Sequence, residues 1–266
     1  MTVDAVVSYA RSAGVRIAFE TRGDGSPLLL VHGLGYGRWG WNPVVGPLAK
    51  RHRVVLLDNR GIGESDVPPG PYTARMLAED AVAVLDAAGI ERAHVVGTSL
   101  GGMIAQELAV EHPDRVERLV LACTTPGGER AAPYPEPTQR LLAEAASLEP
   151  AVALRRFVEN ALAPGAPGPL VDEIVALRLA HPPDPAGWQA QAAAAVAFDG
   201  YDRLAWIAAP TLVLHGTADR VVDCRNALLL AGRIPNARLE LFEGLGHLFF
   251  WEAPDRFLAC VGEFLA

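Results

Sequence analysis

The sequence predicts a doubly wound α/β sheet, in which mostly parallel strands are covered by helices on both faces. Short, almost wholly apolar runs such as Leu28–Val31 and Val54–Leu57 are typical of strands that are buried on both faces. These runs alternate with longer helical patterns along much of the chain, which is the signature of an α/β fold. Half of the 266 residues are hydrophobic, enough to build one large core.

The first 125 residues contain six of the expected strands. The chain opens with a predicted hairpin, whose strands at Ala5–Ala10 and Val15–Thr21 are joined by a turn at Ser12–Gly14. Thr73 is the expected N-cap of the helix at Thr73–Ala88. The elements expected after the hairpin are strands at Leu28–Val31, Val54–Leu57, Ala93–Gly97 and Leu119–Cys123, and helices at Trp39–Lys50, Thr73–Ala88 and Ser99–Glu111.

The alternation breaks after Thr125. Residues 126–185 contain 11 of the 21 prolines, and three apolar stretches in this block have a helical pattern: Leu141–Leu148, Ala151–Leu162 and Leu170–Ala180. A helical block between two strands indicates an insertion that lies over the edge of the sheet. The strands and helices then resume at Thr211–His215, Cys224–Gly232, Arg238–Phe242 and Pro254–Leu265.

Composition and charge exclude several classes of partner. The formal net charge of −8 argues against a nucleic-acid partner or an anionic membrane, because both require an excess of Lys and Arg. Cys123, Cys224 and Cys260 are too widely spaced for a disulfide framework or a zinc pattern, so reduced thiols are expected. The chain shows no signal-peptide pattern and no apolar run of transmembrane length. These features predict a cytoplasmic protein and leave its oligomeric state open.

Residues 95–102 read VVGTSLGG and predict a nucleophilic serine. In a G-x-S-x-G turn, the serine occupies a strained position between a strand and a helix, and its hydroxyl is exposed above the sheet. Gly97 and Gly101 fill the two glycine positions, and the expected flanking strand and helix supply the context. The alternative is that Ser99 only caps the helix.

A serine hydroxyl is a weak nucleophile at neutral pH, so it requires a base and an acid that orients the base. In this type of fold, the order along the chain is Ser, then Asp or Glu, then His. Asp219 follows a buried strand in TLVLHGTADRVV, and His247 follows the next strand in LELFEGLGHLFFWEAPD. Asp223 is the alternative acid. All these residues would emerge at the carboxyl ends of strands, where ligands of open α/β sheets bind.

An oxyanion hole is the fourth requirement for acyl transfer. One donor is expected to be the backbone N–H that follows the serine, here that of Leu100. The other comes from the loop after an early strand, which reads VHGLGYG and offers the N–H of Leu34. Losing one such donor typically costs about 2.7–4 kcal/mol of transition-state stabilisation.

Five ordered motifs together resemble the α/β-hydrolase family: HGLG, LLDNRGIGESD, VVGTSLGG, APTLVLHGTAD and GLGHLFFWEAPD. Within that family the chain is most similar to small bacterial carboxylesterases and 3-oxoadipate enol-lactonases. The resemblance implies a mostly parallel eight-stranded sheet with a core of residues 1–125 and 207–266. It also implies a helical cap at residues 126–206, inserted after the sixth strand. It implies Ser99 as nucleophile, His247 as base and Asp219 as acid. Acyl transfer through these residues calls for no cofactor or metal.

For several other residues, the sequence allows more than one role. His215 is expected to be a buried, hydrogen-bonded neutral side chain, and Asp58 and Arg60 to form a structural ion pair or to guide an anionic substrate. His32 either supports the oxyanion loop or contacts substrate. The candidates for the substrate pocket are His32, Tyr36, Trp39, Met103, Tyr134, Trp188 and Phe198.

These features predict a serine hydrolase that acts on a small, fairly hydrophobic ester or lactone. Three other activities would use the same triad: a cofactor-free perhydrolase, a carbon–carbon bond hydrolase and a tailoring enzyme of secondary metabolism. The HGLGYG loop differs from the G-x-G-P-G-like loop typical of carbon–carbon bond hydrolases. A ligand-sensing, hydrolase-like receptor is the alternative outside enzymology.

Overall fold

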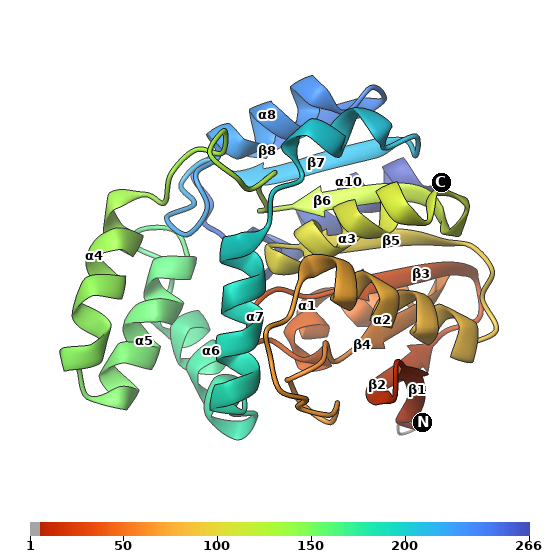
Figure 1. Ribbon diagram of the computed structural model, residues 1–266. Helices are drawn as coiled ribbons and strands as arrows, with labels where there is room; N and C mark the ends of the chain where they lie inside the picture. Colours follow the sequence, from red (N-terminus) through yellow and green to blue (C-terminus); the bar gives the residue numbers. More distant parts are fainter. Residues whose placement is uncertain (1–5) are drawn as a thin grey trace.

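A computed structural model describes residues 6–266, which form an eight-stranded sheet in the order β1-β2-β4-β3-β5-β6-β7-β8 (Figure 1). β1 and β2 pair antiparallel, β2 pairs antiparallel with β4, and the remaining neighbours are parallel. This confirms the predicted doubly wound sheet. The strands are β1 (Ser8–Ser12), β2 (Val15–Arg22), β3 (Ser26–Val31), β4 (His52–Leu57), β5 (Ala93–Thr98), β6 (Val116–Ala122), β7 (Thr211–Gly216) and β8 (Ala237–Phe242).

Helices cover both faces of this sheet. The α-helices of the described residues, including those of the insertion, are α1 (Asn42–Leu48), α2 (Ala74–Ala87), α3 (Leu100–Glu111), α4 (Glu136–Glu144), α5 (Pro150–Ala161), α6 (Gly168–Ala180), α7 (Pro185–Ala197), α8 (Arg225–Arg233), α9 (Phe249–Glu252) and α10 (Pro254–Leu265). Buried side chains of α2, α3 and α8 form one core cluster, and those of α1, α9 and α10 belong to a second. Within β3, Leu29 and Val31 join the first cluster, whereas Leu28 and Leu30 join the second. This alternation explains why Leu28–Val31 is wholly apolar.

The opening hairpin differs slightly from its prediction. β1 extends to Ser12, so the turn is only Ala13-Gly14, with φ values of 48° and 87°. Two successive positive φ values are typical of the two-residue turn that matches the twist of the paired strands. Ala5, the first residue of the predicted strand, lies outside the described residues.

Four helices, α4 to α7, lie between β6 and β7 in the sequence and form the inserted segment, residues 126–206. In Figure 1 they lie together at one side of the sheet, with α7 nearest the rest of the molecule. The two ends of the segment pair with each other, because Gly128 N–H donates to Phe198 O at 3.0 Å and Gly200 N–H donates to Pro126 O at 2.8 Å.

The helices of the inserted segment were predicted unevenly. The first begins at Glu136, five residues before the expected start, and the second and third lie within two residues of the expected ranges. α7 was not predicted as a separate helix. Its signal is Asp184 before Pro185, because the Asp184 carboxylate accepts hydrogen bonds from Ala186 and Gly187 N–H and so caps the helix.

The expected pairing of Asp58 with Arg60 is wrong. Asp58 instead pairs with Arg38 at 3.1 Å, while Arg60 forms a bidentate pair with the fully buried Asp80. The two neighbouring residues point to different partners, so both ion pairs brace the loop after β4.

Two further observations bear on the classes of protein considered above. Within residues 6–266, no helix combines the length and the apolar character needed to cross a bilayer. The same part of the chain contains no cluster of three or more His, Cys, Asp or Glu side chains arranged to hold a metal ion.

Candidate active site

Ser99 occupies a strained turn between β5 and α3. Its φ of 54° and ψ of −121° lie outside the regions that a non-glycine residue normally adopts. A Cβ at Gly97 would lie 2.3 Å from Gly101 O, and one at Gly101 would lie 2.1 Å from Val31 O. Both positions therefore require glycine. The Ser99 side chain makes no capping hydrogen bond and lines a cavity instead.

Asp219 and His247 are hydrogen bonded to each other in the loops that follow β7 and β8. His247 Nδ1 lies 2.7 Å from Asp219 Oδ2, and the Asp219 side chain is fully buried. The other carboxylate oxygen accepts hydrogen bonds from Val221 N–H at 2.7 Å and Val222 N–H at 2.9 Å. Burial alone would raise the pKa of Asp219, but the charge of His247 and the hydrogen bonds from His215 and His247 lower it overall. Asp219 is thus held as a carboxylate against the imidazole.

His247 and Ser99 line the same cavity, although no hydrogen bond between their side chains is found among the described residues. Catalytic hydrogen bonds are often long or poorly aligned without substrate and tighten when it binds. Asp223, the alternative acid, pairs with Arg225 at 2.8 Å and makes no contact of this kind with His247. The geometry therefore favours Asp219 over Asp223 as the partner of His247.

His215 is a second partner of Asp219 that sequence reasoning missed. The side chain is buried as expected, and its Nε2 lies 3.0 Å from Asp219 Oδ2 and 2.9 Å from Val222 O. Both neighbours are acceptors, so Nε2 must bear the hydrogen. The sequence contained one signal of this contact, the spacing. His215 lies near the end of β7 and four residues before Asp219.

The loop after β3 lies directly against the nucleophile. A Cβ at Gly33 would lie 2.8 Å from Ser99 Cβ and 3.4 Å from its Oγ. Leu34 and Leu100 both line the cavity, and neither of their backbone N–H groups donates to an acceptor within residues 6–266. Free N–H groups beside the serine hydroxyl are what an oxyanion hole requires.

His32 supports this loop from within the core. Its Nδ1 accepts a hydrogen bond from Gly33 N–H at 2.7 Å, and its ring stacks on Tyr36 with centroids 4.7 Å apart. Burial, followed by the charge of His247, lowers the pKa of His32 to about 3. The imidazole is therefore neutral at pH 7. Asn59 Nδ2 donates to His32 O at 3.0 Å and fixes the backbone at the start of the loop.

The inserted segment holds the same loop from the other side. Arg178 Nη1 donates to Gly35 O at 2.9 Å, and Gln191 Oε1 accepts from Gly35 N–H at 3.4 Å. Gln191 is fully buried and its Nε2 also donates to Arg60 O at 2.8 Å. A Cβ at Gly35 would lie 2.8 Å from the Trp188 ring, so only glycine fits there. Sequence analysis identified neither Gln191 nor Arg178.

The cavity above Ser99 has a volume of about 570 Å³, in the range of ligand-binding pockets. Its wall contains six of the seven predicted pocket residues: His32, Tyr36, Met103, Tyr134, Trp188 and Phe198. Trp39 is not among the lining residues. Its ring lies 4.9 Å from that of Tyr36 and stacks on His181 instead, so that prediction is wrong.

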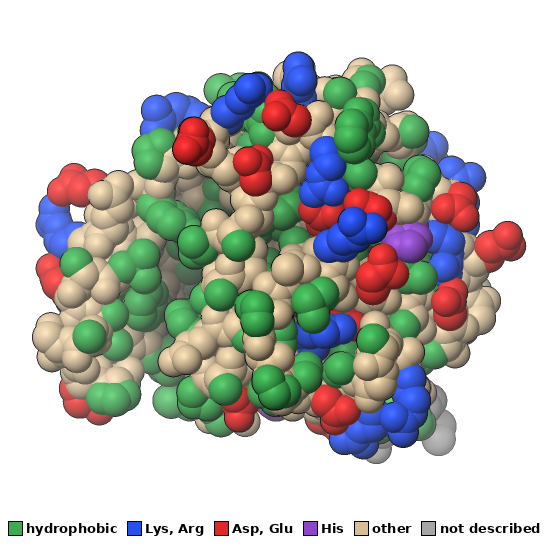
Figure 2. All heavy atoms as spheres, in the orientation of Figure 1, with side chains coloured by type: hydrophobic (Ala, Val, Ile, Leu, Met, Phe, Trp, Pro, Cys, Tyr) green, Lys and Arg blue, Asp and Glu red, His purple; other side chains and the backbone are tan. Residues whose placement is uncertain are grey.

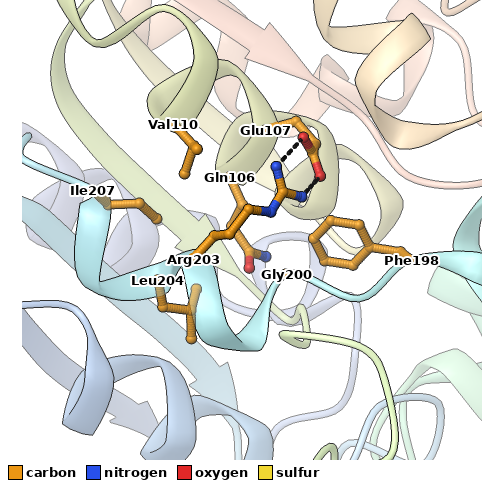
Figure 3. A pocket seen from close by; sticks show the side chains of 8 residues that line it. All are labelled: Gln106, Glu107, Val110, Phe198, Gly200, Arg203, Leu204 and Ile207. Atoms are coloured by element: carbon orange, nitrogen blue, oxygen red, sulfur yellow. Dashed lines mark hydrogen bonds and ion pairs between the residues drawn. The ribbon is translucent and has the colours of Figure 1, made fainter.

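A second recess, beside the end of the inserted segment, is too small to be a substrate site. Its volume is about 10 Å³, room for one water at most. Figure 3 shows Arg203 pairing with Glu107 of α3 across this recess, with Phe198 at its edge. The ion pair between Arg203 and Glu107 joins the end of the inserted segment to α3, the helix that begins after Ser99. Phe198, at the edge of the recess, also lines the large cavity.

Comparisons with known proteins agree with this architecture. A family model described as the alpha/beta hydrolase fold matches residues 26–254. The chain belongs to the α/β-hydrolase family. The resemblance seen in the sequence is thereby confirmed.

Relatives of this α/β-hydrolase are similar along nearly their whole length. It is 34% identical to the "Putative carbamate hydrolase RutD" of Azorhizobium caulinodans, covering 94% of each chain. It is also 34% identical to 2-hydroxymuconate semialdehyde hydrolase of a Pseudomonas strain, covering 96% of this chain and 92% of the other. The solved enol-lactonase of Burkholderia xenovorans superimposes with a TM-score of 0.85 at 28% identity, covering 97% and 99%. The protein is an enzyme, an α/β-fold hydrolase.

Proposed function

We propose that this α/β-hydrolase cleaves a carboxylic ester or lactone through Ser99, His247 and Asp219. The observation that supports this most directly is the 2.7 Å contact between His247 Nδ1 and the buried Asp219 carboxylate, at a cavity that Ser99 also lines. A carboxylate on Nδ1 leaves Nε2 of the neutral ring as the basic nitrogen. The enol-lactonase similarity agrees with an ester-type substrate.

The mechanism follows from these positions. His247 Nε2 accepts the Ser99 proton as the hydroxyl oxygen attacks the substrate carbonyl carbon. The N–H groups of Leu34 and Leu100 bind the oxyanion that forms, and Asp219 stabilises the imidazolium. His247 then donates the proton to the departing alkoxide, which leaves an acyl group on Ser99. Water, activated by the same imidazole, attacks the acyl-enzyme and releases the acid.

The inserted segment, residues 126–206, is proposed to act as the cap over this site. It contributes most of the cavity wall away from the strands, including Tyr134, Trp188 and Phe198. Because its lining is mostly apolar, the cap favours a fairly hydrophobic substrate.

Hydrolysis of short-chain p-nitrophenyl esters tests the proposal. The native enzyme is expected to release p-nitrophenolate and to be labelled by a fluorophosphonate probe, whereas Ser99→Ala is expected to do neither. Ser147→Ala, at an exposed serine of the inserted segment, is the matched control and should behave as native. Equal ester turnover by native enzyme and Ser99→Ala would refute the assignment of the nucleophile.

A second candidate is carbon–carbon bond hydrolysis of an unsaturated keto acid, which one observation favours. Arg178 lines the cavity, where its Nη1 donates to Gly35 O, and among residues 6–266 it forms no ion pair with a carboxylate. A cation of this kind can bind a substrate carboxylate. The relative named 2-hydroxymuconate semialdehyde hydrolase is named for a substrate that carries a carboxylate. Consumption of 2-hydroxymuconate semialdehyde, followed by its visible absorbance, would favour this candidate over the ester hydrolase if Arg178→Met lowers it far more than the same variant lowers p-nitrophenyl ester hydrolysis.

A further inference from the structure

Four large hydrophobic side chains line the catalytic cavity and are also exposed to solvent. They are Tyr134, Leu142, Phe157 and Val196, with exposed fractions of 47%, 51%, 36% and 74%. A side chain that meets both the cavity and the solvent must lie where the cavity opens. We call these four residues the apolar rim. Figure 2 shows the surface hollowed beside the inserted helices, with hydrophobic side chains gathered along the hollow.

The rim is assembled from separate parts of the inserted segment. Tyr134 precedes α4, Leu142 lies on α4, Phe157 on α5 and Val196 on α7. Single exposed hydrophobic residues are common on protein surfaces, but a group of them around a cavity mouth marks a binding surface.

Charged groups of the cavity lie away from this rim or are already paired. Among the described lining residues, the charged side chains other than histidine are Arg178 and Asp223. Arg178 is bonded to Gly35 O and lies 4.7 Å from the Tyr36 ring, which places it at the oxyanion loop. Asp223 pairs with Arg225. The rim therefore suits the apolar end of a ligand rather than a charged one.

The cavity is also too large for a short ester. A dry protein cavity of about 150 Å³ takes up one benzene, which has six heavy atoms, so 570 Å³ has room for about 23 heavy atoms at the same density. Ethyl acetate, with six heavy atoms, would fill about a quarter of this volume. The apolar wall between Ser99 and the rim would then stay in contact with water, which is unfavourable.

We infer that the preferred substrate is an ester or lactone with a flexible apolar chain of about eight to twelve carbons. The chain would run from the carbonyl carbon at Ser99 through the cavity to the apolar rim. This inference rests on the proposed function and narrows its substrate class.

The test is the dependence of kcat/KM on chain length, on both sides of the ester bond. One series uses p-nitrophenyl esters from acetate to dodecanoate, and the other uses alkyl acetates from ethyl to dodecyl. Each methylene transferred from water to an apolar site raises kcat/KM about fourfold at full burial. We expect a rise of at least 50-fold between two and eight carbons in one of the two series. A flat or falling profile beyond four carbons in both would overturn the inference.

Charged variants of the rim localise the effect. Val196→Asp and Leu142→Asp are expected to lower the ratio of decanoate to acetate kcat/KM at least tenfold. The matched control is Leu179→Asp, because Leu179 is 60% exposed on neighbouring α6 but does not line the cavity. The control should leave the ratio unchanged. An equal fall of the ratio in control and rim variants, or no fall in either rim variant, would contradict the assignment.

Binding of a fatty acid separates this inference from the proposed chemistry. The Ser99→Ala variant cannot hydrolyse esters, but calorimetry should show that it binds decanoate at least tenfold more tightly than butanoate. In the double variant Ser99→Ala with Val196→Asp, this difference should disappear. If no ester is cleaved but decanoate binds in this way, the proposed function fails and the chain-binding site stands. If short esters are cleaved and decanoate shows no advantage, only the chain-binding site fails.

Discussion

The exchange of Asp219 for asparagine tests the geometry on which the proposed chemistry depends. The Asp219 carboxylate is fully buried and its Oδ2 lies 2.7 Å from His247 Nδ1. At an effective dielectric constant of about 20, a full charge pair at about this separation is stabilised by about 6 kcal/mol. Triads that lose this carboxylate but keep its shape lose about 10⁴ in kcat, which is about 5.5 kcal/mol. We therefore expect Asp219→Asn to lower kcat by about 10³- to 10⁴-fold.

The matched control is Asp223→Asn, because Asp223 is four residues away and lines the same cavity. Its carboxylate pairs with Arg225, which is largely exposed, so the loss in kcat should stay within about threefold. The assay is burst and steady-state hydrolysis of a p-nitrophenyl ester, with thermal unfolding to confirm that both variants are folded. Asp219→Asn activity within tenfold of native, or an equal loss in Asp223→Asn, would refute the reasoning.

Three further predictions concern stability and follow from buried or constrained groups. Burial, then the charge of His247, lowers the pKa of His32 to about 3, whereas the unfolded pKa is about 6.5. The contribution of neutral His32 to the free energy of unfolding is therefore fully present above pH 6.5 and is lost as the pH falls toward 3. Urea unfolding should show a loss of about 2 kcal/mol between pH 8 and pH 5. A urea midpoint that does not change between these pH values would contradict this. Gly262→Ala, where an added Cβ meets nothing within 4 Å in α10, should stabilise the protein by about 0.5–1 kcal/mol, and a loss of stability would show that the helix cannot accept it. Arg60→Met leaves the buried Asp80 charge without its partner and should cost about 3–5 kcal/mol, whereas Arg16→Met, in an exposed pair, should cost far less. Equal costs for these two variants in denaturant titrations would count against this view of the buried pair.

The sequence predicted the sheet because each central strand contains a stretch that is buried on both faces and is therefore apolar. Leu28 to Val31 show this directly, since alternate residues face the two core clusters. The position of Ser99 was equally predictable, because Gly97 and Gly101 have no space for a Cβ. These signals come from residues that lie close together in the chain, so a single sequence is enough to detect them.

Contacts made by the inserted helices were not predictable in the same way. Gln191 lies 156 positions from Gly35, with which it shares a hydrogen bond, and nothing near either residue indicates the other. The wrong pairing of Asp58 with Arg60 has a related cause. Two residues of opposite charge, separated only by Asn59, suggested a pair, but the buried Asp80, 20 residues from Arg60, provides the better-matched bidentate partner.

These long-range contacts connect the inserted segment to both loops of the proposed chemistry. On the oxyanion side, Arg178 and Gln191 bind the carbonyl and the N–H of Gly35, next to the Leu34 donor. On the acid side, Arg220, which follows Asp219, donates to Leu162 O at 3.1 Å and accepts a hydrogen bond from Thr138 Oγ1 at its own carbonyl. The strands bring the loops to one edge of the sheet, but hydrogen bonds from the inserted helices fix the backbone beside each reacting group. The inserted segment therefore both shapes the cavity and helps to set the geometry of the groups that face it.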